Sequence, residues 1–144
     1  MIAVDTNLLV YAHRRDSDWH TEARRHIGDL AEGRESWGIP WPCIHEFISV
    51  VTHPRIFRRP STLSEAIAQV EAWLESPTLV LLSEGGGHWR ALRAALETGK
   101  VVGPLVHDAR IASLCIEHSV RELWTADRDF GRFKGLPFRN PLVR

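Results

Sequence analysis

The sequence predicts a three-layer α/β domain in which helices cover both sides of a central, mostly parallel sheet. Short, wholly apolar runs recur along the chain, and such runs are typical of strands buried on both faces. The segments between them carry apolar residues three or four positions apart, the spacing of amphipathic helices, so each connection is long enough to join parallel strands. A length of 144 residues fits one core, and we expect a single domain over residues 1–144.

The first half of the chain is expected to form two strands and three helical segments. Their order is a strand at 2–4, a helical turn at 6–11, a helix at 19–31, a strand at 37–39 and a helix at 44–51. Thr6 or Asn7 can cap the first turn with a side-chain oxygen. The segment 40–42, Pro-Trp-Pro, is expected to end the second strand and turn the chain. Pro54 ends the next helix, because a residue before proline avoids the helical region.

The second half continues the alternation. We expect a helix at 62–75, a strand at 78–82, helices at 88–97 and 104–118, a strand at 122–125 and a last edge strand at 136–138. Thr62 and Glu65 have the spacing of a capping box. The apolar stripe of that helix is expected to be Leu63, Ala66, Ile67, Val70 and Leu74. The three glycines at 85–87 form a plain connector, since the lysine and hydroxyl residue of a phosphate-binding loop are missing.

Composition and charge narrow the classes of function. The 18 basic and 18 acidic residues balance, so the chain has no global positive field of the kind that attracts nucleic acids. Arginine clusters can still bind phosphate locally. The apolar runs are too short to cross a membrane, and we expect a cytoplasmic protein. Cys43 and Cys115 are expected to be free thiols, because their neighbours lack the usual spacing of a zinc site.

Five acidic residues stand apart from the acids on helix surfaces. Asp5 follows the first strand, and Asp127 and Asp129 follow the strand at 122–125. Asp108 lies early in an apolar helix, and Glu46 lies in another, where we expect it to be half buried. Taken singly, each could be only a helix cap or a partner of the helix dipole. Together they should meet at one edge of the sheet, where mutual repulsion calls for a cation such as Mg²⁺ or Mn²⁺.

Four short motifs carry a family resemblance over nearly the whole chain. They are Val4-Asp5-Thr6-Asn7, His45-Glu46-Phe47, His107-Asp108-Ala109 and Thr125-Ala126-Asp127-Arg128-Asp129-Phe130. In this order and spacing the sequence resembles the PIN domains, specifically the VapC-type toxins of bacterial toxin–antitoxin pairs. The resemblance implies an Mg²⁺-dependent endoribonuclease in which metal-activated water cleaves RNA, structured RNA such as tRNA or rRNA included. It also implies a cognate VapB-type antitoxin as inhibitor and a homodimer.

The resemblance also assigns roles to the acidic residues. Asp5, Glu46, Asp108 and Asp127 would be catalytic, and Asp5, Asp108, Asp127 and Asp129 would hold the metal, with Asp127 favoured over Asp129 as the inner ligand. Thr6, Asn7 and Thr125 would support the site, the threonine hydroxyls by orienting ligands and Asn7 by shaping the turn after Asp5. Capping explains Thr6 equally well. His45 and His107 are poor candidates for a general acid, because neighbouring helix positions point about 100° apart.

A basic and aromatic group could grip RNA at the mouth of the site. Its members are Trp41, Arg55, Phe57, Arg58, Arg59 and Arg128. Aromatic rings stack on bases and arginines contact phosphates.

Other classes of protein fit the sequence less well. The aspartate-phosphorylating hydrolases need a second acid two residues after the first, where this chain has Asn7. A receiver domain needs paired acids before its phosphorylated aspartate and a late lysine, and neither is visible. A PIN-like scaffold that binds RNA or protein without cleaving remains the alternative, although such a copy would be expected to lose some of the acids.

Overall fold

The computed structural model describes residues 1–143, and the predicted domain end at residue 144 lies outside them. Five strands form the sheet: β1 (Ile2–Val4), β2 (Trp37–Pro40), β3 (Leu79–Leu82), β4 (Glu122–Trp124) and β5 (Phe138–Arg139). The α-helices are α1 (Thr6–His13), α2 (His20–Glu32), α3 (Trp41–Val51), α4 (Leu63–Leu74), α5 (His88–Thr98) and α6 (Val106–Glu117). Two 3-10 helices, η1 (Gly103–Leu105) and η2 (Arg128–Arg132), complete the set. The predicted α/β class is confirmed.

The sheet has the order β3-β2-β1-β4-β5, and its strands are parallel throughout rather than mostly so. Ile2 of β1 lies opposite Trp37 of β2 on one side and opposite Glu122 of β4 on the other. The chain builds β2 and β3 outward from one side of β1 and then returns to add β4 and β5 on the other. The direction therefore reverses between β1 and β4, and a crevice forms at the carboxyl ends of strands at such a reversal.

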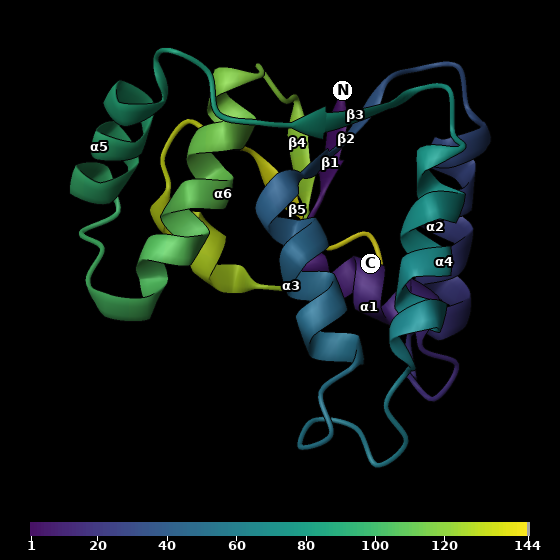
Figure 1. Ribbon diagram of the computed structural model, residues 1–144. Helices are drawn as coiled ribbons and strands as arrows, with labels where there is room; N and C mark the ends of the chain where they lie inside the picture. Colours follow the sequence, from purple (N-terminus) through teal and green to yellow (C-terminus); the bar gives the residue numbers. More distant parts are fainter. Residues whose placement is uncertain (144) are drawn as a thin grey trace.

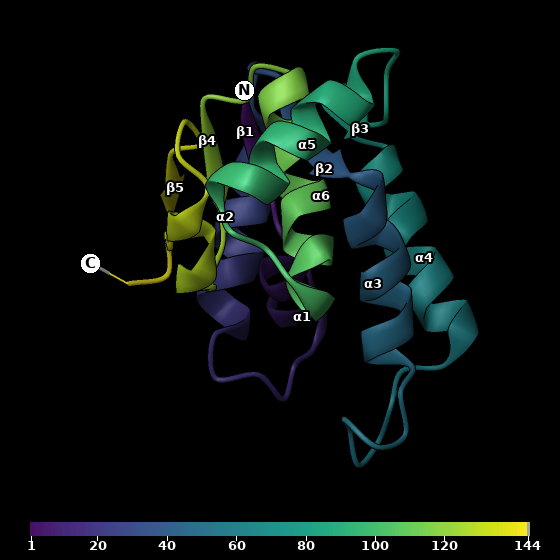
Figure 2. The same ribbon diagram turned by 90° about the vertical axis from the view of Figure 1, so that its left-hand side faces the viewer.

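Helices cover both faces of the sheet, as predicted. Figure 1 shows α5 and α6 on one side and α2 and α4 on the other. Figure 2 looks from the side of α5 and α6, and there α2 lies behind the strands. The inner strands are buried on both faces, with Ala3, Val4, Ile39 and Leu123 inaccessible to solvent. This burial explains why these strands are apolar throughout.

Helix α3 begins earlier than predicted. Trp41 and Pro42 form its first turn instead of a turn of the chain before residue 44. Proline is tolerated there because the first N–H groups of a helix have no partner within the helix. The other predicted elements are present, with ends shifted by a few residues.

Helix α4 has its predicted capping box and only part of its predicted apolar stripe. The Thr62 side chain accepts from the backbone N of Glu65, and the Glu65 side chain accepts from the backbone N of Thr62. Leu63, Ile67 and Leu74 are exposed, whereas the inward face carries Ala66 and Val70, as predicted, together with Trp73. The Trp73 ring packs edge-on against Phe47, at 4.8 Å between centroids. This contact packs α4 against α3.

Two further predictions concern the cysteines and the length of the apolar segments. Cys43 and Cys115 are free and buried, as expected. No helix within residues 1–143 is long and apolar enough to cross a membrane.

Candidate metal centre

A cleft of about 340 Å³ opens at the carboxyl edge of the sheet, outside β1 and β4. Its walls come from α1, α3, α6 and two loops. The lining residues are Asp5, Thr6, Asn7, Val10, Tyr11, Glu46, Val50, Ile56, Phe57, Asp108, Ile111 and Asp127. Four of the five acids singled out in the sequence therefore face one cleft, although they come from four segments of the chain.

Asp5 lies at the floor of this cleft and is buried. It follows β1 directly, and its backbone N donates to the carbonyl of Trp124 in β4 at 3.0 Å. Its Oδ1 accepts from the backbone N of Thr6 at 2.8 Å and from the Cys43 thiol at 3.6 Å. Its Oδ2 accepts from the Thr125 hydroxyl at 2.8 Å and from the Asn7 amide at 3.1 Å. Four donors thus hold the carboxylate in one orientation.

Burial nevertheless raises the pKa of Asp5 to about 6. The hydrogen bonds from Thr125 and Thr6 lower the pKa, whereas the nearby charges of Glu46 and Asp108 raise it further. The charged form is therefore disfavoured without a cation, because desolvation outweighs the donors.

Thr125 connects the two inner strand ends. Its hydroxyl donates to Asp5 and accepts from the Asn7 amide at 3.2 Å and from the backbone N of Asp127 at 3.0 Å. The Asn7 side-chain oxygen accepts from the backbone N of Ala126 at 3.1 Å. Asn7 and Thr125 therefore fix the loop after β4 relative to Asp5.

Removing this hydroxyl should destabilise the fold. We expect Thr125→Val to lower the free energy of unfolding by about 2–4 kcal/mol, because the buried groups that now bond to the hydroxyl would lose their hydrogen-bond partner. Thr125→Ser keeps the hydroxyl and should cost about 1 kcal/mol for the lost methyl group. Urea denaturation measures both values. Equal stability of the two variants would contradict this role of the hydroxyl.

Three carboxylates gather near the rim of the cleft. One oxygen from each of Asp108, Asp127 and Asp129 lies within 4.8 Å of the others. Asp127 is held by accepting from the backbone N of Asp129 at 2.8 Å. The pKa of Asp108 is raised to about 6 by partial burial and by the charges of Asp127, Asp129 and Glu46. Such crowding of hard oxygen donors favours a divalent cation of the Mg²⁺ type. Asp5 lies outside this group of three, on the floor of the same cleft.

Glu46 is exposed, so the expectation that it is half buried is wrong. The apolar residues of α3 that surround it in sequence, such as Phe47 and Ile44, turn toward the core on other faces of the helix. The Oε2 of Glu46 accepts from the Thr6 hydroxyl at 3.2 Å and faces the cleft. Thr6 therefore contributes through its side chain as well as through the turn after Asp5.

Comparison with known proteins identifies the family. The family model described as "PIN domain" matches residues 2–136. The chain belongs to the PIN domain family. A VapC ribonuclease of Mycobacterium bovis (Mb2897) and ribonuclease VapC43 of Mycobacterium tuberculosis are each 37% identical over 142 residues, which cover 99% of this chain and 96% of the relative. Among PIN domains, the chain is thus of the VapC type.

Solved structures of other VapC-type proteins show the same fold. VapBC2 of Rickettsia felis, bound to a DNA fragment from its promoter, aligns with a TM-score of 0.66 and 21% identity, over 96% of this chain and 98% of that chain. VapC20 of Mycobacterium tuberculosis, a toxin that cleaves the sarcin–ricin loop, aligns with a TM-score of 0.64 and 15% identity, over 91% and 93% of the two chains.

The predicted RNA-contact group of this PIN domain is dispersed. Arg55 and Arg58 are exposed, and Arg128 is exposed between the two aspartates of the late motif. Trp41 is 39% exposed but does not line the cleft. Arg59 lies against a separate cavity between α1, α2 and α4, so its expected place at the mouth of the acidic cleft is wrong. The loop at 52–62 turns Phe57 toward the acidic cleft and Arg59 away from it.

The sequence reading missed several residues of the PIN-domain cleft. Val10, Tyr11, Val50, Ile56 and Ile111 form an apolar wall that no motif marks. The sequence predicts Cys43 only as a free thiol with no part in the site, whereas its thiol donates to Asp5. The spacing along α1 could have predicted part of this wall, because Val10 and Tyr11 lie one to two helical turns after Asp5.

Proposed function

We propose that this PIN domain is an Mg²⁺-dependent endoribonuclease, the toxin of a VapBC pair. The observation that carries the proposal is the convergence of Asp5, Glu46, Asp108 and Asp127 on one cleft in a chain whose relatives are named ribonucleases. The substrate would be RNA, with structured RNA such as tRNA or rRNA as the first candidates. A VapB-type antitoxin would be the inhibitor, and we expect a homodimer.

The residues present fit a small divalent cation. Asp108, Asp127 and Asp129 offer oxygens close enough that small side-chain rotations bring them to a common centre. Partial burial and the charges of Asp127, Asp129 and Glu46 raise the pKa of Asp108, so the ionised form of Asp108 is disfavoured without a cation. Mg²⁺ would balance that charge, and Mn²⁺ has the same ligand preference. When bound, the ion supplies an activated water and shields the phosphodiester oxygens.

The side chains of the cleft have distinct tasks in this proposal. Asp5 is held rigid by its four donors, which keeps the floor of the site fixed while substrate binds. Glu46 is exposed at the opposite wall and can take a proton from a water or return one to the leaving oxygen. Phe57 and the apolar wall, which includes Ile111, pack against ribose and base and limit access of bulk water.

Purified protein should cleave RNA only when Mg²⁺ or Mn²⁺ is present. The test incubates total RNA with the wild-type chain in Mg²⁺, in Mn²⁺ and in EDTA, and sequences the new RNA ends. Defined ends in the two metal reactions and intact RNA in EDTA are the expected result. Addition of the cognate VapB-type protein should suppress the cleavage. Cleavage that persists in EDTA would contradict metal dependence, and binding of RNA without cleavage in any metal would favour the scaffold alternative.

A further inference from the structure

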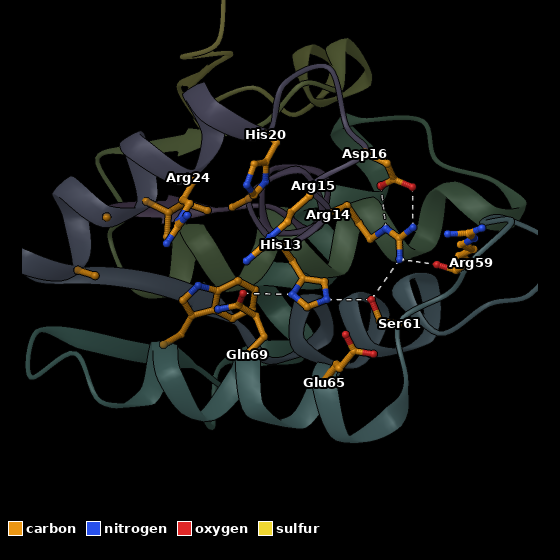
Figure 3. A pocket seen from close by; sticks show the side chains of 15 residues that line it. His13, Arg14, Arg15, Asp16, His20, Arg24, Arg59, Ser61, Glu65 and Gln69 are labelled. Atoms are coloured by element: carbon orange, nitrogen blue, oxygen red, sulfur yellow. Dashed lines mark hydrogen bonds and ion pairs between the residues drawn. The ribbon is translucent and has the colours of Figure 1, made fainter.

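A second and larger cavity, of about 810 Å³, lies on the far side of α1 from the acidic cleft. We call it the arginine cavity. Its basic lining residues are His13, Arg14, Arg15, His20, Arg24 and Arg59, contributed by α1, α2, the loop between them and the loop before α4. Figure 3 shows Arg15, His20 and Arg24 across from the α4 side chains Glu65 and Gln69, with His13 between them. Among the described residues, none lines both cavities.

The charge of the arginine cavity is positive although the chain as a whole is neutral. Arg14 is the one arginine with a carboxylate partner there, since its Nη2 lies 2.6 Å from Asp16. Within residues 1–143, no acidic oxygen lies within 4.0 Å of a guanidinium nitrogen of Arg15, Arg24 or Arg59. Three guanidinium groups therefore remain available to an anion.

The wall of the cavity is built by hydrogen bonds. His13 bridges the Gln69 oxygen at 3.1 Å and the Ser61 hydroxyl at 2.9 Å. Arg14, which is buried, donates to the Ser61 hydroxyl at 3.3 Å and to the carbonyl of Arg59 at 2.9 Å. The dashed lines in Figure 3 show how these bonds join α1, the loop and α4. The backbone that carries the exposed arginines is thus held in place by these hydrogen bonds at Arg14, Ser61 and Arg59.

The two cavities adjoin through shared elements. Tyr11 of α1 lines the acidic cleft and His13, half a turn later, lines the arginine cavity. In the loop, Phe57 faces the cleft and Arg59 faces the cavity. The Arg14 guanidinium lies 4.0 Å from the centroid of the Phe57 ring and connects the two sides.

We propose that the arginine cavity binds phosphodiester groups of the RNA strand on one side of the scissile bond. This inference rests on the proposed function and names an additional contact surface for its substrate. The acidic cleft repels a polyanion, and the neutral chain offers no general attraction, so affinity for RNA must come from local cations. Arginine forks match phosphate oxygens in pairs, and the cavity places three of them within reach of a strand that leaves the cleft.

The test compares RNA binding by two matched double variants. Arg15→Ala/Arg24→Ala removes two exposed arginines of the cavity, and Arg90→Ala/Arg93→Ala removes two exposed arginines of α5. Fluorescence anisotropy with a labelled single-stranded oligoribonucleotide in EDTA measures affinity without cleavage. We expect the cavity variant to bind about 10-fold more weakly than the wild type and to lose about 1.4 from the slope of log affinity against log salt. The α5 variant should bind like the wild type, and thermal unfolding should show that both are folded.

The outcomes separate this inference from the proposed function. Equal affinity of the cavity variant and the wild type would overturn the inference, whatever the cleavage assay shows. A selective loss of RNA binding supports it even if no preparation cleaves RNA, a result that would contradict the nuclease proposal alone. A polyglutamate peptide that displaces the RNA more effectively than an unlabelled oligoribonucleotide of equal charge would also overturn it, because the cavity would then be a site for an acidic protein.

Discussion

Asp108→Asn is expected to reduce Mg²⁺-dependent RNA cleavage by about 1000-fold or more while the fold persists. Asp108 is the member of the three-carboxylate group that comes from α6, and its oxygen is within 4.8 Å of oxygens from Asp127 and Asp129. The substitution is nearly isosteric but removes one negative charge from the cluster that would bind the cation. Loss of a charged group at a reacting centre commonly costs several kcal/mol of the activation barrier. Initial rates of cleavage at saturating RNA measure the effect, and circular dichroism checks the fold.

Asp18→Asn is the matched control for this variant. Asp18 is exposed in the loop before α2 and does not line the acidic cleft. The control makes the same chemical change far from the site, so its cleavage rate should stay within about twofold of the wild type. If Asp108→Asn kept more than about a tenth of the wild-type rate, the assignment of Asp108 to the metal site would be wrong.

The order of strands and helices could be read from the sequence because burial on both faces leaves a direct pattern. Ile2-Ala3-Val4 and Leu79–Leu82 are apolar at successive positions, and both are strands of the parallel sheet. The gathering of Asp5, Asp108 and Asp127 could also be predicted, since parallel strands end at one edge of the sheet. These predictions depend only on local pattern and on the topology that it implies.

The rotation of helices and the path of loops could not be read in the same way. Glu46 lies among apolar residues in sequence, but whether it is buried depends on which face of α3 meets the core. Leu63 and Ile67 look like core positions, yet α4 turns Trp73 inward instead. Arg59 faces the arginine cavity because Arg14 binds its carbonyl from another element, at 2.9 Å. Each of these wrong predictions depends on contacts between elements far apart in the sequence, which the spacing of neighbouring residues does not encode.

The stabilising effect of a neutral Asp5 should disappear as the pH rises. The pKa of Asp5 is about 6 in the folded chain and 3.8 in the unfolded chain, so the folded state binds more protons between these values. This contribution is fully present below pH 3.8 and is lost as the pH rises through about 6. The loss amounts to about 3 kcal/mol at most. Urea denaturation in EDTA should therefore show the stability of the wild type, relative to Asp5→Asn, falling from acid to neutral pH.

The comparison with Asp5→Asn is needed because other groups also make stability depend on pH, among them Asp108, whose pKa is likewise raised to about 6 by partial burial and by the charges of Asp127, Asp129 and Glu46. Asp16 has its pKa lowered by Arg14, so its contribution is lost as the pH falls, which is the opposite trend. Asp16 keeps its ion pair with Arg14 in both proteins, so its contribution cancels in the difference between them. A difference that stays flat from acid to neutral pH would show that the pKa of Asp5 is the same in the folded and unfolded chains. With Mg²⁺ added at neutral pH, the wild type should gain stability, because the ion binds only the folded state. Asp108→Asn should gain much less, because the ion needs the three-carboxylate group.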